Sequence, residues 1–297
     1  MFALSKNALR KHILTRGRLL DPKLPSGMKS FSFAAAIVVG SMIPPTTALS
    51  IPQRYHRNHH IESPTTRLFS VSAYEGVPSY GKSGTDKLRL PLRARLPNPD
   101  GGSRLVQVGT FDTPEEIEAG RELMNDVIIE GRAWPFEPTF ETEESFRGYF
   151  LSHAAFVVRD LSNNQQHKVL GAFYIKPNFP GRCSHICNGG FIVQPETRGY
   201  RVGTLMGACF LQFARQLGYQ AAYFNLVFES NQVSIKLWER LGFERVATIP
   251  KAARLEGMPI DKETGDPKLD TAFGYYYDLT KLPDDYDPLE FTGLSKL

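Results

Sequence analysis

The sequence predicts a single α/β domain over residues 84–285, followed by a C-terminal tail over 286–297. Three observations support this fold class. Several segments alternate apolar and polar residues, which is typical of half-buried strands. Others repeat apolar residues every three or four positions, as amphipathic helices do. Strand and helix patterns are interspersed along the chain without an internal repeat, and one mixed domain accounts for this order better than two separate ones.

The predicted strands and helices follow one another in this mixed order. The strands span 87–96, 104–111, 154–161, 168–177, 186–193, 220–228, 243–249 and 272–280. The helices span 113–131, 142–153, 202–217 and 230–242. The first helix begins with a capping box, in which Thr113 is the N-cap, Pro114 takes the first helical position and Glu116 stands three residues after the cap. Gly218 ends the third helix, and Ser230 is the expected cap of the fourth.

The composition is that of a globular protein with an uneven charge distribution. Of the 297 residues 41% are hydrophobic, which is enough to bury a sizeable core. The first 70 residues carry ten Lys/Arg against two acids, a balance of +8, so the net charge of +4 leaves −4 for the rest. A slightly acidic domain does not favour a nucleic-acid partner. Three cysteines are too few for a disulfide framework and indicate a reducing compartment.

Residues 1–80 are predicted to be a targeting segment or a disordered N-terminal region. The chain is basic and free of acids until Asp21, which is typical of a mitochondrial transit peptide, and the sequence RLFSVS at 67–72 is similar to a processing site. We therefore favour the mitochondrial matrix, with the cytoplasm as the alternative. A start at Met28 would instead turn the apolar run at 31–43 into a secretory signal. That run is too short to span a membrane.

The segment around residue 185 has the spacing of a metal or redox site. Cys183, His185 and Cys187 would share one face of a strand. A structural zinc site needs four ligands, and the sequence offers no second pair at a suitable distance. CxxxC spacing also differs from the CxxC of a dithiol motif. We interpret these cysteines as packing residues, together with Cys209 on the apolar face of a predicted helix, and expect no metal.

The loop PETRGYRVG that follows indicates phosphate binding. It lies between a predicted strand and a predicted helix, where backbone N–H groups and the positive end of the helix can hold a pyrophosphate. Arg198 and Arg201 would add positive charge, and Gly199 and Gly203 would leave room for the phosphates. Taken alone, the pattern also suits an ordinary loop before a helix.

This loop, with NGGFIV before it and FNLVFESNQVSIKLWERLGF after it, resembles the acetyl-CoA site of the Gcn5-related N-acetyltransferase (GNAT) superfamily. The resemblance implies a mixed, mostly antiparallel sheet with flanking helices. One strand would be splayed by a bulge at Gly189 and Gly190 and would pair with the pantetheine arm. The implied cofactor-binding residues are Ile192, Val193, Arg198, Gly199, Tyr200, Arg201, Val202, Gly203, Thr204 and Asn231.

Two longer stretches, 171–193 and 223–255, are similar to the fungal acetyltransferases that act on L-azetidine-2-carboxylate and other proline analogues. This resemblance implies acetyl transfer from acetyl-CoA to the secondary amine of a small cyclic imino acid: azetidine-2-carboxylate, cis-4-hydroxyproline or a proline-pathway intermediate. It also implies a homodimer. Asn188 would orient the substrate, and the backbone of Asn225 and Leu226 would bind its carboxylate.

The chemistry requires a neutral amine, a backbone donor for the oxyanion and a proton for the leaving thiolate. We expect the N–H of Val193 to be that donor and the amide of Asn188 to hold the imino acid. Arg201 replaces the usual loop glycine of the superfamily, so its side chain is an alternative phosphate contact. The tyrosine that many members use as an acid falls at Trp238, which cannot deliver that proton, and no general base stands out.

Two other functions remain open. Acetylation of protein lysines or polyamines predicts an acidic groove, whereas an imino acid needs a site for its carboxylate. A CoA-binding module without turnover is favoured only by the missing tyrosine. Trp134 and Phe228 suit either an apolar pocket or the core. Residues 273–278 are interpreted as a sheet or dimer strand, and 255–270 as a charged surface insertion.

Overall fold

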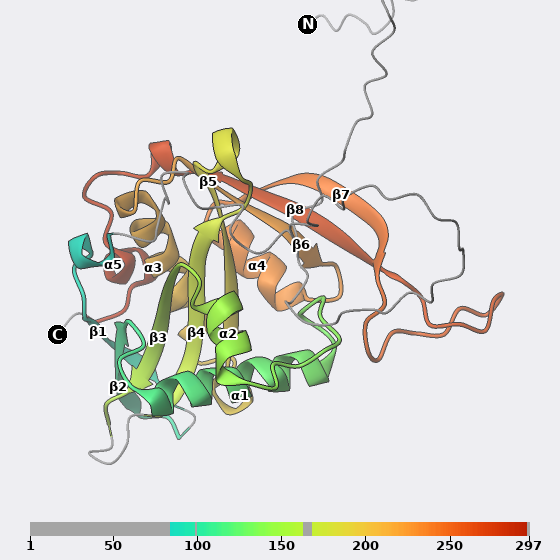
Figure 1. The fold of residues 1–297 in the computed structure, drawn as a ribbon, viewed down its shortest axis with the longest axis horizontal. Helices are drawn as coiled ribbons and strands as arrows, with labels where there is room; N and C mark the ends of the chain where they lie inside the picture. Colours follow the sequence, from blue (N-terminus) through green and yellow to red (C-terminus); the bar gives the residue numbers. More distant parts are fainter. Residues whose placement is uncertain (1–83, 99, 163–167, 296–297) are drawn as a thin grey trace, which may run out of the picture. The chain divides into compact units, whose positions relative to one another are not determined.

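The computed structural model describes residues 84–98, 100–162 and 168–295, which form a mixed sheet with helices packed on it (Figure 1). The strands are β1 (Leu92–Pro97), β2 (Ser103–Gly109), β3 (Ala154–Asp160), β4 (Val169–Pro177), β5 (Ile186–Val193), β6 (Ala221–Phe228), β7 (Glu244–Ala253) and β8 (Asp270–Asp278). The helices are α1 (Pro114–Glu130), α2 (Glu143–Phe150), α3 (Val202–Gln216), α4 (Gln232–Arg240) and α5 (Pro288–Thr292). The predicted targeting segment lies outside the described residues.

The eight strands are arranged in the order β1-β2-β3-β4-β5-β6-β8-β7. All neighbours run antiparallel except β5 and β6, which are parallel. Parallel strands need a crossover, and α3 supplies it. This arrangement confirms the predicted fold class, a mixed and mostly antiparallel sheet with flanking helices. The aromatic stretch 273–278 lies within β8, between β6 and β7, and is a sheet strand as predicted.

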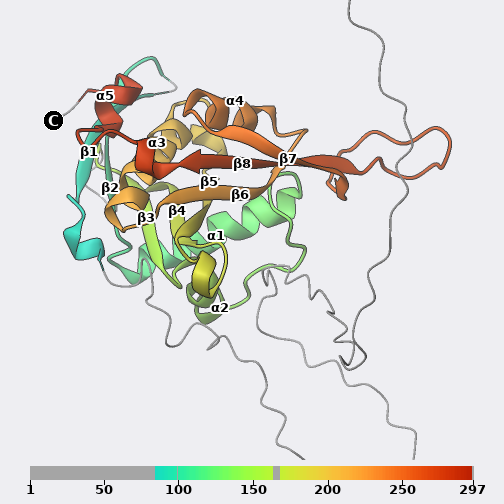
Figure 2. The same ribbon diagram turned by 90° about the horizontal axis from the view of Figure 1, so that it is seen from above.

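Helices cover both faces of the sheet. Successive side chains of the central strand β4 point to opposite sides, and each set packs in a different hydrophobic cluster. Ala172 and Tyr174 pack in the cluster that includes α1 and α2. Phe173 and Ile175 pack in the larger cluster that includes α3. Figure 2 shows α1 and α2 on one side of the sheet and α3, α4 and α5 on the other.

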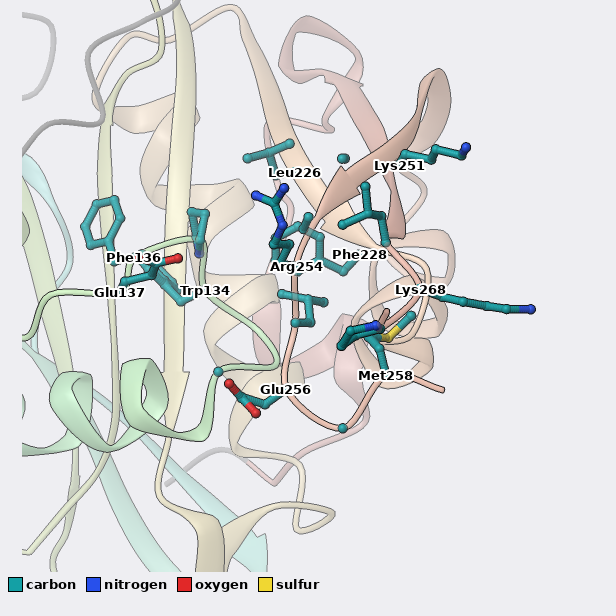
Figure 3. Close-up of a pocket in the computed structure, with 18 of the residues that line it drawn as sticks. Trp134, Phe136, Glu137, Leu226, Phe228, Lys251, Arg254, Glu256, Met258 and Lys268 are labelled. Atoms are coloured by element: carbon teal, nitrogen blue, oxygen red, sulfur yellow. The ribbon is translucent and has the colours of Figure 1, made fainter. Parts of the chain in front are cut away.

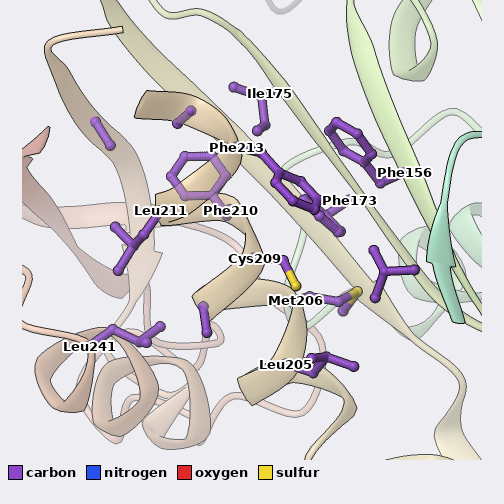
Figure 4. Close-up of a cluster of buried hydrophobic side chains, with 14 of the residues drawn as sticks. Phe156, Phe173, Ile175, Leu205, Met206, Cys209, Phe210, Leu211, Phe213 and Leu241 are labelled. Carbon is purple, nitrogen blue, oxygen red and sulfur yellow. The ribbon is translucent and has the colours of Figure 1, made fainter. Parts of the chain in front are cut away.

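Buried aromatic rings fix α3 on the sheet (Figure 4). The ring centroid of Phe213 lies 4.9 Å from that of Phe156 and 6.3 Å from that of Phe173. Each such ring stabilises the fold by about 1.5–3 kcal/mol through burial. Cys209 lies on the same apolar face and is fully buried, as predicted for a packing residue, and burial raises the pKa of its thiol. The loop before α3 therefore enters a firmly held helix.

The start of α1 differs in one hydrogen bond from the predicted capping box. Thr113 Oγ1 accepts the N–H of Glu116 at 3.3 Å, as expected. The Glu116 carboxylate accepts the N–H of Asp112 at 2.8 Å rather than that of Thr113. It is drawn there by Arg159 of β3, a buried guanidinium that donates to both carboxylate oxygens. A buried ion pair thus fastens α1 to β3.

The predicted bulge at Gly189 and Gly190 is absent, because β4 and β5 keep one register along the whole length of their pairing. The two glycines serve side-chain packing instead. A Cβ atom on Gly190 would lie 2.4 Å from Trp134 and 2.5 Å from Tyr174. A Cβ atom on Gly189 would lie 2.6 Å from Phe210 on the other face. The glycines let aromatic rings close over both faces of β5.

The predicted splay of β5 has a different origin, a fork in the middle of the sheet. β5 pairs with β6 at two positions only, Ile186 with Ala221 and Cys187 with Ala222. Beyond them the two strands diverge, and β6 continues its pairing with β8 alone. Residues 188–193 of β5 therefore have a paired strand on the β4 side only.

The segment predicted as a C-terminal tail packs into the domain. Leu289 and Leu294 are buried in the same hydrophobic cluster as α3. Asp287 caps α5 by accepting the N–H of Leu289 at 2.8 Å. Arg201, just before α3, donates to the carbonyl of Thr292 at the end of α5. Two spaced leucines in a charged segment were the signal for this helix, and they are too few to show a helical period.

Candidate functional site at the fork between β5 and β6

The peptide groups of β5 face the fork at every second residue. In an antiparallel pair, residues that bond the partner strand alternate with residues whose N–H and C=O point away from it. Gln194 donates its N–H to the carbonyl of Leu170 at 3.0 Å. A hydrogen bond at the other end of the β4–β5 pairing fits the same alternation of bonded and outward-facing residues. Gly189, Phe191 and Val193 therefore turn their N–H and C=O groups toward the fork.

This alternation separates two of the predicted cofactor-binding residues. Val193 faces the fork, and its carbonyl accepts a 3.4 Å hydrogen bond from Arg198. Ile192 does not, because its peptide group faces β4 and its side chain is buried in the core. Its peptide group is therefore already used in the pairing with β4, and its role in cofactor binding stays a prediction. Phe191 was not predicted, and its position became evident only from the register with β4.

A cavity of about 120 Å³ lies at the fork. It brings together four predicted residues, Asn188, Asn225, Leu226 and Asn231. Its remaining lining consists of Ala133, Trp134, Pro135, Tyr174, Gly189, Gly190, Phe191, Phe224, Val227, Phe228, Ser234 and Trp238. None of these lining residues carries a formal charge. We call it the inner cavity. Val193, the predicted oxyanion donor, is not among its lining residues, whereas Phe191 is.

Asn188 holds its side chain at the fork by a local hydrogen bond. Its Oδ1 accepts the N–H of Gly189 at 2.8 Å. Because that N–H points toward the fork, the carboxamide lies at the edge of the inner cavity. The two N–H groups of the side chain are left to donate to a bound molecule.

A bulge does occur in this sheet, but in β6. Asn225 and Leu226 together stand opposite the single residue Gly274 of β8, which takes their peptide groups out of the regular ladder. The side chain of Asn225 exchanges two hydrogen bonds with that of Asn178, of 2.9 and 2.7 Å. This amide pair fixes the bulge at the cavity.

The helix α4 supplies an apolar wall and a polar end to the cavity. Trp238 is buried, and its ring centroid lies 4.8 Å from that of Phe191 and 4.7 Å from that of Phe224. The cap of α4 is Asn231 rather than the predicted Ser230, since Asn231 Oδ1 accepts the N–H of Ser234 at 3.2 Å. Asn231 keeps its side-chain N–H groups for a ligand.

The loop before α3 has the backbone shape of an anion site. Gly199 and Arg201 both take positive φ angles, of 86° and 66°, and the first N–H groups of α3 have no acceptor within the helix. Arg198 forms a bidentate ion pair with Glu130 of α1, with distances of 2.9 and 2.7 Å. The side chain of Arg201, the alternative phosphate contact, donates to the carbonyl of Thr292.

A second, larger cavity of about 1180 Å³ adjoins the first and shares Trp134, Pro135, Leu226 and Phe228 with it (Figure 3). We call it the outer cavity. Residues 251–269 form one of its walls, so the predicted surface insertion lines a cavity. Charged lining residues have both signs; they are Glu137, Lys251, Arg254, Glu256, Asp261, Asp266 and Lys268. Trp134 and Phe228 therefore lie between the two cavities. The sequence alone had left open whether these two residues line a pocket or pack in the core.

A buried lysine lies beside Asn188 and was missed by the sequence reasoning. Lys176 of β4 stands in register opposite Asn188. Its Nζ lies 3.8 Å from the ring centroid of Tyr149 and 4.3 Å from that of Tyr174. Burial lowers the pKa of Lys176 to about 7. The ring faces favour the cation by about 0.5–2 kcal/mol, which acts against the effect of burial.

The two tyrosines beside Lys176 are themselves linked and neutral. Their hydroxyl oxygens lie 3.1 Å apart. Burial raises the pKa of Tyr149 to about 12 and raises that of Tyr174 well above its usual value. Neither group can therefore serve as an anionic base near neutral pH.

The family model described as the acetyltransferase (GNAT) family matches residues 121–243. N-acetyltransferase aca1 of Schizosaccharomyces pombe is 55% identical over 89 residues, which are 30% of this chain and 43% of that protein. Protein SPT10 of Saccharomyces cerevisiae is 32% identical over 104 residues, 34% of this chain and 16% of that protein. The matches thus span less than half of the length of these curated relatives.

Solved structures share the fold. A GCN5-related N-acetyltransferase from Kribbella flavida superposes with a TM-score of 0.51 and 24% identity, covering 58% of this chain and 97% of that one. A putative acetyltransferase from Acinetobacter baylyi gives 0.50 and 17%, covering 62% and 98%. The described part of the chain has the GNAT fold. Within it, no three His, Cys, Asp or Glu residues are grouped to hold a metal ion. No helix of these residues is long and apolar enough to cross a membrane.

Proposed function

We propose that the protein is an N-acetyltransferase that uses acetyl-CoA. The observation that carries this proposal is the fork between β5 and β6. Gly189, Phe191 and Val193 turn peptide groups toward it. The Gly189 N–H is bonded to Asn188 and the Val193 carbonyl to Arg198, and an extended amide chain such as pantetheine would pair with the other peptide groups as a strand does. The loop at 198–204 lies at the end of the same strand and suits the diphosphate. The matched family model supports this activity.

The residues of the inner cavity fit the needs of acyl transfer. The N–H of Phe191 points into the fork and would stabilise the oxyanion that forms at the thioester carbonyl. The Asn188 carboxamide would hold the acceptor beside it. Trp238, Phe191 and Phe224 exclude water from the reacting atoms, which strengthens both interactions. Trp238 itself delivers no proton, so the thiolate would take one from the acceptor nitrogen.

We further propose that the acceptor is a small cyclic imino acid. A volume of about 120 Å³ suits a single small ring. The inner cavity has no charged lining residue, which suits a zwitterionic imino acid, whose own carboxylate balances its ammonium, better than the uncompensated ammonium of a polyamine or of a protein lysine. The bulge at Asn225 and Leu226 offers peptide groups for a carboxylate. The sequence likeness to acetyltransferases of proline analogues supports the same acceptor.

The test is release of free thiol from acetyl-CoA. The purified protein is incubated with azetidine-2-carboxylate or cis-4-hydroxyproline, and in parallel with spermidine and a lysine peptide. We expect thiol release with the imino acids only. Release with spermidine or the peptide alone would refute the imino acid and keep the acetyltransferase. CoA binding without release above spontaneous hydrolysis, whatever the acceptor, would favour a binding module.

We also propose a mitochondrial location and a homodimer. The location rests on the composition of residues 1–80, and the N-terminal sequence of the mature protein tests it. For the dimer, β7 is one of the two end strands of the sheet, its outer edge pairs with no other strand of the described residues, and Val246 and Ile249 on it are exposed. Light scattering of the purified protein measures its mass; a monomer at micromolar concentration would refute the dimer.

A further inference from the structure

Lys176 is a buried amine that the acetyl transfer outlined above leaves without a role. It stands opposite Asn188 in the register of β4 and β5, so both side chains leave the same face of the sheet at adjacent positions. Tyr174, two residues earlier on β4, lines the inner cavity, and Lys176 Nζ lies 4.3 Å from the centroid of its ring. Lys176 does not line the inner cavity itself, but it neighbours two residues that do, Tyr174 and Asn188.

Among the residues that the structure describes, no acid pairs with this amine to hold it as a cation. Tyr149 contacts it from α2 and Tyr174 from β4, and both are neutral. Asn188 faces it from β5. On the other side, β3 begins at Ala154 and is preceded by His153, whose Nδ1 lies 3.1 Å from Ser152 Oγ. Among the described residues, Lys176 forms no ion pair with a carboxylate, and burial is the cause of its lowered pKa.

We propose that Lys176, as a neutral amine, accepts the proton of the acceptor ammonium held at Asn188. The inference rests on the proposed function and names the base that this reaction lacks. A cyclic imino acid reaches the enzyme with two protons on its nitrogen. One passes to Lys176 Nζ, and the nitrogen lone pair then attacks the thioester carbon. The C–N bond forms, the C–S bond breaks, and the second nitrogen proton ends on the thiolate. Lys176 returns its proton to solvent after product release.

This role predicts a particular dependence of kcat/KM on pH. The native enzyme needs a neutral Lys176 and a protonated acceptor, so kcat/KM should rise through a pH of about 7 and then stay level up to the pKa of the acceptor. An enzyme without the base can use only the neutral acceptor. Its kcat/KM should keep rising tenfold per pH unit over the same range.

Three variants test the role. Lys176→Met keeps an unbranched side chain between the two tyrosine rings, and should lose about a hundredfold to a thousandfold of kcat/KM at pH 7. The loss should shrink as the pH approaches the acceptor pKa. Lys176→Arg keeps the charge but cannot accept a proton, and should behave like the Met variant. Lys168→Met changes an exposed lysine just before β4 and should leave the profile unchanged.

The acceptor offers an independent check. Fluorine atoms on the ring lower the ammonium pKa, so 4,4-difluoroproline needs the base less than proline analogues without fluorine. The Met variant should lose at least tenfold less kcat/KM with the fluorinated acceptor. An equal loss with both acceptors, or a pH profile of the Met variant parallel to that of the native enzyme, would show that Lys176 only shapes the site and would overturn the inference.

A direct titration separates this inference from the proposed function. Carbon-13 labelling of the lysine ε-carbons gives a resonance for each lysine, and the one missing in Lys176→Met belongs to Lys176. We expect it to titrate near a pH of about 7. A titration near the ordinary lysine value would refute the base whether or not the enzyme acetylates imino acids. A low pKa together with no thiol release would instead refute the proposed reaction.

Discussion

The side-chain amides of Asn178 and Asn225 exchange two hydrogen bonds, of 2.9 and 2.7 Å, and so tie the residue after β4 to the bulge in β6. The strand between them in the sheet is β5. The pair thus fixes the position of the bulge relative to the fork.

We predict that Asn178→Ala raises the KM for the acceptor about tenfold, because the Asn225 amide loses both bonds and the bulge can shift. Each net hydrogen bond is worth about 1 kcal/mol, so unfolding in urea should become about 1–2 kcal/mol easier. The dissociation constant of CoA should stay within about twofold. The double variant with Asn225→Ala should be no worse than either single one; additive losses would mean that the two residues act separately.

Asn188 can be tested with an isosteric change. Asn188→Asp keeps an oxygen for the N–H of Gly189, but it loses the two side-chain donors at the cavity. We predict normal unfolding and normal CoA binding by calorimetry, with thiol release reduced at least a hundredfold. Asn188→Ala should lose turnover as well, and some stability in addition. Parallel loss of CoA binding and turnover in the Asp variant would make Asn188 a structural residue.

Arg198 and Glu130 should affect CoA binding in opposite directions. The bidentate ion pair restrains a guanidinium next to the loop that we assign to the diphosphate. We predict that Arg198→Ala weakens CoA binding about threefold to tenfold, and that Glu130→Gln strengthens it, because the arginine is then free to meet the phosphates. Both effects should fade in about 1 M salt, where charges are screened within a few ångströms. Weaker binding in both variants would indicate that the pair shapes the loop.

The buried pair of Glu116 and Arg159 should make stability depend on pH. Burial raises the pKa of Glu116, but the hydrogen bonds from Arg159 and from the Asp112 N–H outweigh burial, so the net pKa is lowered. A lowered carboxyl pKa stabilises the fold above the unfolded value of about 4.3, and this stability is lost as the pH falls through the folded pKa. We predict that Glu116→Gln costs about 3–5 kcal/mol at pH 7.

The urea unfolding of both proteins at pH 7 and at pH 3 checks this expectation. The native protein should lose more stability between the two values than Glu116→Gln does, since the variant has no carboxylate to protonate at this position. Other acids contribute equally to both proteins and cancel in the difference. Equal losses would show that the ion pair contributes nothing to acid sensitivity.

Substitutions at two glycines should distinguish a glycine needed for side-chain packing from one needed to leave room for the ligand. A Cβ atom on Gly190 would lie 2.4 Å from Trp134, so Gly190→Ala should cost about 1–3 kcal/mol of stability and distort the inner cavity. A Cβ atom on Gly203 would have its nearest neighbour at 3.8 Å, so Gly203→Ala should be neutral or up to about 1 kcal/mol more stable. Its CoA affinity should nevertheless fall, because the added methyl group lies where we place the phosphates. An unchanged affinity for CoA would show that the diphosphate does not bind next to Gly203.

Local sequence patterns predicted the helices and strands well, but they did not predict features that depend on how distant segments pack together. The strand over 186–193 and the helix that follows were expected with almost the observed bounds, since their periodicity is local. The absence of a bulge in β5 depends on its register with β4, which no local pattern encodes. The glycines were instead required by rings that pack on them from distant segments.

The same limit applies to the site. Asn188, Asn225 and Asn231 were expected from a resemblance, and the structure brings them to one cavity. Lys176 escaped notice because an isolated lysine at the end of a strand reads as a solvated residue. Its burial arises from Tyr149, which comes from a helix on another part of the chain.

The contact between Arg201 and Thr292 has a consequence for protein synthesis. The two residues are 91 positions apart, so the loop before α3 leaves the ribosome long before its anchor on α5 exists. A nascent chain that ends between these two residues can form β5 and α3. Arg201 must then keep its positive φ without the hydrogen bond to Thr292. The loop therefore gains this contact only after α5 has been translated.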